Sequence, residues 1–256
     1  MKRVQYGDLN FWHFDNLSQF PSVRHFVSER ILAGDKEFTL SLSSSPDRNF
    51  VLANRQKVAD AMGIAPEKLV MPSQVHKTRI VNVTSHTTKD ELQETDALIT
   101  AEKGICIAVM SADCVPILLY DKKNNVCGAV HSGWKGTVAK ILEKTLHAMS
   151  ESFGTRGENV IAGIGPSVSQ QSYEVGAEVV EAVRQSFSNA NDLLIPLPAS
   201  KARLNLWDAN KVQLQEFGVP EAQIEISDLC TVLNNNYFFS ARKGDSGRFA
   251  AGILLT

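Results

Sequence analysis

Apolar residues recur at helical spacing in three parts of the chain, which predicts three amphipathic helices. The first covers residues 50–64 and stops at Gly63, with an expected buried face of Val51, Leu52, Val58, Ala59 and Met62. The second lies within residues 125–154, after a strand and a glycine-rich turn, and its expected buried stripe comprises Val138, Ile141, Leu142, Thr145 and Met149. The third covers residues 173–187.

Short apolar runs and period-two alternation predict strands between these helices. Residues 68–83 suggest two short strands around Pro72, with His76 on the face opposite to Val75 and Lys77. The other strand-like segments are 97–121, which has the pattern of a β-hairpin, the start of 125–154, 159–169 and 224–255.

Strands and helices interleave without a linker, a repeat or a break in composition, which is typical of an α/β protein. The 256 residues are 43% hydrophobic and 21% charged, as in ordinary soluble globular proteins. We therefore expect one α/β domain over residues 1–256, with two adjacent subdomains as the open alternative.

Charge and cysteine usage exclude several classes of function. A formal net charge of −2 without runs of lysine or arginine argues against binding to nucleic acid or anionic membranes. The N-terminal residues lack the apolar stretch of a signal peptide, and no segment approaches the roughly 18 apolar residues of a membrane span. The four cysteines show no CxxC spacing and favour thiols or metal ligands over a disulfide framework. We expect a cytoplasmic protein, whose oligomeric state the sequence does not predict.

Among the residues of the types that bind transition metals, three stand out, namely His76, Cys114 and His131. Imidazole nitrogen and thiolate sulfur are ligands of zinc and copper, and three protein ligands leave a fourth position open, as in catalytic zinc sites. Such a metal lowers the pKa of bound water towards about 7. The spacing of the three residues equally allows a buried thiol and two strand-end histidines, so both interpretations stay open at this point.

Seven segments, taken in order, carry a resemblance to a known family. They are SQVHKTRI, ETDALIT, SADCVPILL, AVHSGWKGTVAKIL, GIGPSVSQQSYEVG, LWDANKVQL and FFSARKGDSGR. From about Arg55 to its C-terminus the chain resembles the YfiH-like family, which is also called the laccase-domain or polyphenol-oxidase family and the purine nucleoside phosphorylase family with that domain. In that family one zinc is bound by the histidine of QVH, the cysteine of ADC and the histidine of VHSGW. These match His76, Cys114 and His131 here.

The resemblance implies a layered α/β sandwich with mixed β-sheets, related to the catalytic domain of cytotoxic necrotizing factor toxins. It also implies phosphorolysis of adenosine, inosine, guanosine or methylthioadenosine, with adenosine deamination as a second reaction. Residues 1–50 depart most from the family pattern. QSYEVG replaces the usual CCYEVG, and FFSARK replaces FFSYRR, so that Arg242 is retained.

Five further residues are candidates for the chemistry. Asp113 precedes Cys114 and is expected to act as a general base or, alternatively, to cap a turn. The candidates for substrate binding are Lys135, Arg55 and Arg242, as phosphate contacts, and Gln74, as a contact to a base or ribose hydroxyl. Each of the three cations has an ordinary alternative as a solvated or ion-paired surface residue.

Three other functions compete with the nucleoside enzyme. Cys114 is a candidate nucleophile with His131 as its base, in a hydrolase that could act on peptidoglycan precursors. Against it, the charge of neighbouring Asp113 disfavours the thiolate unless another group compensates. A copper polyphenol oxidase is disfavoured because the six histidines contain no H-x-H pair. A non-catalytic binding module is the remaining alternative.

Overall fold

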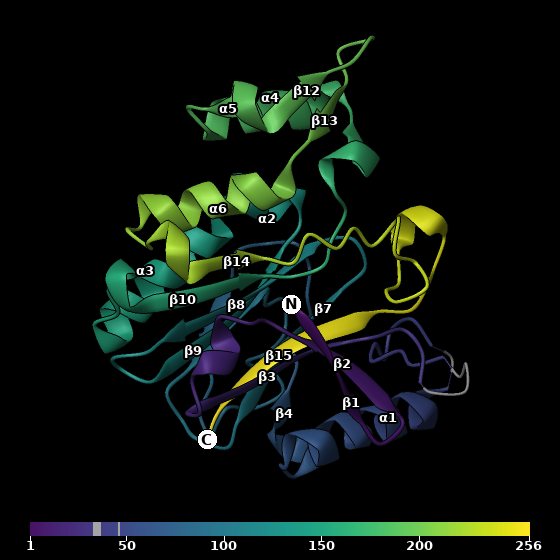
Figure 1. Cartoon of the computed structure of the whole chain (residues 1–256), viewed down its shortest axis with the longest axis vertical. Helices are drawn as coiled ribbons and strands as arrows, with labels where there is room; N and C mark the ends of the chain where they lie inside the picture. Colours follow the sequence, from purple (N-terminus) through teal and green to yellow (C-terminus); the bar gives the residue numbers. More distant parts are fainter. Residues whose placement is uncertain (33–36, 46) are drawn as a thin grey trace.

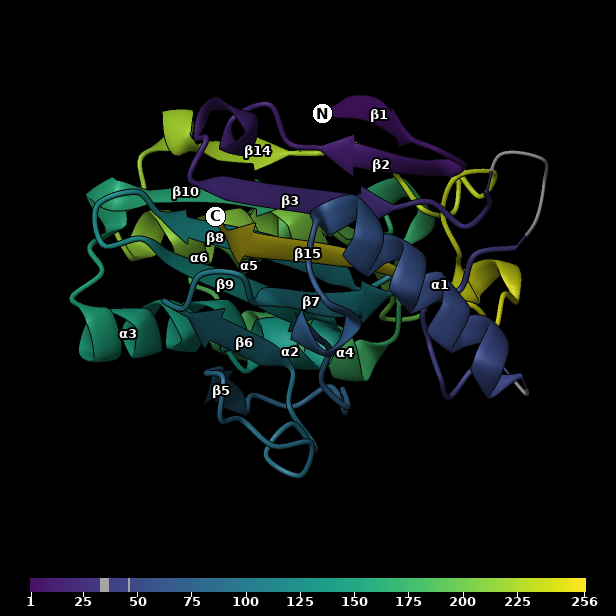
Figure 2. The same ribbon diagram turned by 90° about the horizontal axis from the view of Figure 1, so that it is seen from below.

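Two six-stranded mixed β-sheets lie face to face at the centre of the molecule (Figures 1 and 2). The computed structural model describes residues 1–32, 37–45 and 47–256. The first sheet has the order β1 (Lys2–Tyr6), β2 (Leu9–His13), β3 (Val23–Ser28), β15 (Phe249–Leu255), β7 (Cys106–Ser111) and β4 (Leu69–Val70). The second has the order β14 (Ile224–Ile226), β10 (Val160–Ile164), β8 (Val115–Asp121), β9 (Val126–Ser132), β6 (Ala97–Thr100) and β5 (Ile80–Asn82).

Helices cover the outer face of each sheet, so the sandwich has four layers. Helix α1 (Arg48–Met62) packs on the first sheet, and α3 (Ile141–Phe153) and α6 (Leu206–Glu216) pack on the second (Figure 1). Short helix α2 (Trp134–Val138) follows β9. Beyond α2 and α6 lies a small group formed by β11 (Glu174–Val175), α4 (Ala177–Ser186), α5 (Ala190–Leu193), β12 (Leu194–Pro196) and β13 (Ala202–Leu204). The predicted α/β class with mixed sheets is confirmed.

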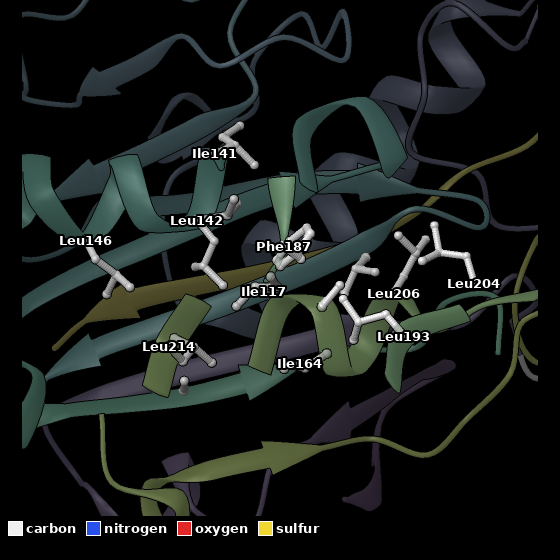
Figure 3. Packing of buried hydrophobic residues seen from close by; sticks show 14 of the residues in the cluster. Ile117, Ile141, Leu142, Leu146, Ile164, Phe187, Leu193, Leu204, Leu206 and Leu214 are labelled. Atoms are coloured by element: carbon white, nitrogen blue, oxygen red, sulfur yellow. The ribbon is translucent and has the colours of Figure 1, made fainter. Parts of the chain in front are cut away.

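Strand periodicity explains how both faces of each sheet are buried. In β8, Ile117 faces the helices and Leu118 faces the opposite sheet, and both are fully buried. Figure 3 shows Ile117 and Ile164 of the sheet beneath Leu142 of α3 and Leu214 of α6. Each such side chain contributes about 1.5–3 kcal/mol through burial. The central strands are therefore almost continuously apolar, which is the pattern seen in residues 97–132.

The helix predictions were correct in position but wrong in three details. The third helix, predicted from residue 173, begins only at Ala177, because Glu174–Val175 pair with β13 as β11. Helix α1 ends at Gly63, as predicted, but Leu52 is 44% exposed. Asn54 takes a place on the buried face instead, where its side-chain amide donates a hydrogen bond to the Thr39 carbonyl. The segment after β9 is not one helix but two, because Lys140 adopts a left-handed conformation with φ of 60° between α2 and α3.

The predicted hairpin over residues 97–121 is wrong. Its three strands do not pair with one another: β7 belongs to the first sheet, whereas β6 and β8 flank β9 in the second. The true hairpin joins β8 to β9, with Asn125 in the turn at a φ of 53°. Residues 224–255 contain only β14 and β15 as strands within this described segment. Among the described residues no helix is both long and apolar enough to cross a membrane.

Candidate metal centre

His76, Cys114 and His131 converge from three separate segments. Their ligand atoms all lie within 4.8 Å of one another, and they form the one such cluster of three or more potential ligands found among the described residues. Cys114 is in the turn before β8, and His131 is near the end of β9. The antiparallel register explains their proximity, because Val115 is paired with Ser132. The three candidate ligands predicted from the sequence therefore lie close together in the fold.

A buried carboxylate, Asp96, fixes both histidines. Its Oδ1 accepts a hydrogen bond from His131 Nδ1 at 2.8 Å, which leaves Nε2 of that ring available to a metal ion. The same carboxylate accepts hydrogen bonds from the backbone amides of Val75, His76 and Lys77 at 3.2, 2.9 and 2.8 Å. This wrapping holds His76 at a φ of 61°. The strand alternation predicted for residues 75–77 is therefore wrong, since these amides bind a carboxylate and not a neighbouring strand.

The sequence reasoning missed Asp96 as a site residue. It lies in the segment ETDALIT and is fully buried directly before β6, all of whose residues are buried. A carboxylate at the head of the mainly apolar strand Ala97–Thr100 was the available signal, because buried charges require partners.

The electrostatics of the cluster favour a thiolate. Burial raises the pKa of the Cys114 thiol, but the imidazoles of His131 and His76 outweigh it, and the pKa lies below its usual value. Burial lowers the pKa of His131, but the neighbouring Cys114 and Asp96 outweigh this effect, so the pKa lies above its usual value. Burial also opposes ionisation of Asp96, yet the hydrogen bonds from His131 and the backbone amides hold its pKa low. The compensating group that a Cys114 thiolate requires is therefore present.

Gly133 makes room for the cluster. A Cβ atom at this position would lie 2.8 Å from Cys114 Sγ and 3.2 Å from His76 Cδ2. The glycine also begins α2 as its N-cap residue. Any side chain here would collide with Cys114 or His76, which gives a physical reason for the first glycine of the SGWKG segment.

A cavity of about 330 Å³ opens onto the cluster. This volume lies within the range of small-molecule sites. Its lining consists of Val75, His76, Asp113, Cys114, Trp134, Lys135, Val168, Tyr173 and Leu206. The walls therefore combine apolar and aromatic surface with a few polar groups, one of which is a cation. This composition suits a flat, mainly uncharged ligand that carries or meets an anionic group.

The predicted residues Asp113 and Arg242 are linked to each other at this cavity. The carboxylate of Asp113 accepts hydrogen bonds from the Thr231 hydroxyl at 2.6 Å and from the Arg242 amide at 2.8 Å. The guanidinium carbon of Arg242 lies 4.9 Å from the centre of the Tyr173 ring, and its Nη2 donates to the Glu174 carbonyl. Both Asp113 oxygens thus hold the surrounding segments in place, which favours a positioning role over that of a general base.

The other predicted substrate contacts are divided between the cavity and other parts of the fold. Lys135 lines the cavity, with its Nζ 5.6 Å from the Trp134 ring centre. Gln74 does not line it, and its side-chain amide is paired with the backbone N–H and carbonyl of Met110. Arg55 lies on α1, on the outer side of the first sheet, where it donates to the Leu40 carbonyl at 2.9 Å.

The donor set fits a single transition-metal ion. Two imidazoles and one thiolate are ligands for zinc or copper, and three protein ligands leave a position for water or substrate. The orientation of His131 is fixed by a buried carboxylate, as is usual for metal-binding histidines. His76, Cys114 and His131 would hold such an ion.

Comparison with known proteins finds a family model and several relatives that match most of this chain. A family model described as multi-copper polyphenol oxidoreductase laccase matches residues 24–256. A purine nucleoside phosphorylase of Bacteroides thetaiotaomicron is 38% identical, over 94% of this chain and 95% of that protein. A protein named adenosine deaminase RL5, from an unknown prokaryotic organism, is 37% identical over 79% of this chain and 81% of its own length.

Solved structures confirm the fold. The hypothetical protein YfiH of Bacillus licheniformis superposes with a TM-score of 0.89 at 26% identity, covering 98% of this chain and 97% of that one. YlmD of Geobacillus stearothermophilus superposes with a TM-score of 0.87 at 25% identity, covering 99% and 98%.

Proposed function

Because this chain belongs to the family described as multi-copper polyphenol oxidoreductase laccase, and resembles proteins named purine nucleoside phosphorylase, we propose that it is a zinc-dependent purine nucleoside phosphorylase. Its expected substrates are adenosine, inosine, guanosine and methylthioadenosine together with phosphate. The observation that carries the proposal is the cavity that joins the His76, Cys114 and His131 cluster to aromatic walls and a cation. We further propose that it acts in the cytoplasm on free nucleosides.

Each part of the cavity suits one part of these substrates. Trp134 offers aromatic surface for the face of the purine, and Leu206, Val168 and the edge of Tyr173 add further contacts. Lys135 supplies the positive charge that a phosphate dianion requires. A zinc ion bound by the three ligands would supply Lewis-acid polarisation of an oxygen that enters its open position.

Adenosine deamination is the second activity that we propose for the same site. The similarity to the protein named adenosine deaminase RL5 supports it, as does a ligand set that leaves one metal position for water. A multicopper oxidase is not proposed, despite the family description, because the described residues contain a single cluster of three candidate ligands. Such oxidases require several copper-binding groups.

A cysteine hydrolase remains the competing function, since the imidazoles beside Cys114 would also activate a nucleophile. Its substrates would include peptidoglycan precursors. Metal content separates the two proposals: about one zinc per chain, with activity lost on chelation and restored by zinc, supports the phosphorylase. A metal-free enzyme that alkylation inactivates would support the hydrolase.

The decisive assay follows the products from each nucleoside with and without phosphate. Purified protein is incubated with each of the four nucleosides, and the free base, the sugar 1-phosphate and inosine are separated by chromatography. We expect base and ribose 1-phosphate only when phosphate is present, and inosine from adenosine in either case. His131→Ala should abolish both reactions, whereas the exposed residue His86 offers a matched control in His86→Ala. Zinc-loaded wild-type protein that turns over none of the four nucleosides would contradict the proposal.

A further inference from the structure

Half of the polar side chains that line the cavity are already committed to other partners. His76 and Cys114 belong to the metal cluster, and both oxygens of Asp113 accept hydrogen bonds from elsewhere in the fold. Among the described lining residues, this leaves Lys135, Trp134 and Tyr173 with donor groups that can reach a ligand. Lys135 matches the anionic substrate, and the indole of Trp134 donates a hydrogen bond without ever releasing its proton. Tyr173 is therefore the neutral group that can both donate and release one.

Tyr173 is held firmly by groups other than its hydroxyl. Its ring lies under the Arg242 guanidinium, and its carbonyl accepts a hydrogen bond from the Leu204 amide at 3.1 Å, which attaches it to β13. Arg242 is itself fixed by its amide on Asp113 and by its Nη2 on the Glu174 carbonyl. No hydrogen bond to the Tyr173 hydroxyl occurs within the described residues. The ring is therefore positioned while its hydroxyl is left for a ligand.

We infer that the Tyr173 hydroxyl donates a hydrogen bond to the purine of a bound nucleoside and protonates that base as it leaves. The inference rests on the proposed phosphorylase function. It assigns the phosphate to Lys135 and the base to Tyr173, because a charged donor matches a dianion and a neutral donor matches an uncharged heterocycle. Arg242 becomes a positioning residue for the tyrosine, since its guanidinium is already engaged with the ring and with a backbone carbonyl.

Atoms and charge are conserved in the proposed step. A phosphate oxygen bonds to C1′ of the ribose while the C1′–N9 bond breaks, and the electron pair of that bond leaves on the purine. The purine takes the phenol proton at N7. The hydrogen phosphate loses its own proton as its oxygen bonds to C1′, and this proton returns to the phenolate through water. Base, ribose 1-phosphate and neutral Tyr173 result.

The test replaces only the hydroxyl and compares two leaving groups. Tyr173→Phe keeps the ring beneath Arg242, and it is assayed on inosine and on 7-methylinosine with phosphate. N7 of 7-methylinosine already carries a methyl group and positive charge, so its base leaves without protonation. We expect kcat for inosine to fall about 100-fold, as for loss of a general acid, and kcat for 7-methylinosine to stay within about threefold of wild type. Tyr237→Phe is the matched control, because that tyrosine also lies beneath an arginine, Arg3, but outside the cavity.

The outcomes separate this inference from the proposed function. Equal losses on the two substrates would assign Tyr173 a merely structural role, and undiminished turnover of inosine would remove it from the reaction; either result overturns the inference while the phosphorylase stands. A wild-type enzyme inactive on both substrates overturns the proposed function and the inference with it. Selective loss on inosine, with Tyr237→Phe unchanged, supports the inference.

Discussion

Replacing Asp96 with asparagine keeps the size of the side chain but removes half of its acceptors. Oδ1 accepts from His131 Nδ1 and the His76 amide, and Oδ2 accepts from the amides of Lys77 and Val75. An asparagine amide has one oxygen, so in either orientation its NH₂ group faces two other donors. Two hydrogen bonds are lost, and N–H groups oppose each other inside a fully buried environment.

The magnitude follows from these contacts. Hydrogen bonds to a charged group contribute about 1.5–3 kcal/mol each, so the loss of two should lower the free energy of unfolding by about 3–6 kcal/mol. The same carboxylate orients His131 towards the metal position, and loss of such a contact typically lowers metal affinity about 10- to 100-fold.

Two measurements test these numbers. Urea unfolding of the chelated protein gives the stability, and competition with a zinc indicator gives the affinity. Asp121→Asn provides a matched control, because Asp121 is equally buried and its carboxylate accepts the amides of Lys123 and Asn124 in a turn away from the cavity. We expect this control to lose stability and to keep zinc affinity within about twofold. If Asp96→Asn binds zinc as tightly as the control, our account of the carboxylate is refuted.

Three further predictions concern separate parts of the molecule. Gly133→Ala should weaken zinc binding about 5- to 150-fold, because its methyl group would overlap Cys114 Sγ and overpacking costs about 1–3 kcal/mol. Competition with a zinc indicator measures the affinity, and an unchanged value would contradict the prediction. Arg242→Ala should lower kcat for inosine and leave the KM for phosphate unchanged, because the guanidinium positions Tyr173; a selective rise in that KM would return Arg242 to the phosphate site. Burial lowers the pKa of His25 to about 3, below its value of about 6.5 in the unfolded chain, so its stabilisation is full above pH 6.5 and is lost as the pH falls. Between pH 6.5 and 5, wild type should lose about 1.6 kcal/mol more stability than His25→Gln, as measured by urea unfolding, and parallel losses would refute this.

The sequence predicted the candidate ligands His76, Cys114 and His131 better than the secondary structure around them. His76, Cys114 and His131 could be selected because their side-chain types restrict the chemistry and because ordered motifs surround them. The local structure around His76 could not be predicted from alternation. The carboxylate that captures its backbone is 20 residues away in the chain, at Asp96.

Hydrophobic periodicity gave wrong predictions where tertiary contacts determine which residues are buried and which strands pair. Leu52 is exposed because Asn54 finds a buried backbone partner, which a hydrophobic pattern cannot reveal. The strands of residues 97–121 read as a hairpin, yet the apolar runs carry no information about which sheet receives each strand. Tyr173 was overlooked for a related reason, since only the fold brings it, Lys135 and Cys114 to one cavity.

The β8–β9 hairpin also bears on the order in which the metal ligands assemble during folding. Closing the hairpin over a short turn places Cys114 and His131 together, and hairpins of this kind form within microseconds. His76 joins them only after Asp96 and the β5–β6 pairing have brought in a distant loop, at a higher entropic cost of closure. We therefore expect Cys114 and His131 to approach each other before His76 joins them. Zinc added at the start of refolding would then meet two of the three candidate ligands, whereas zinc added at the end would meet the finished site.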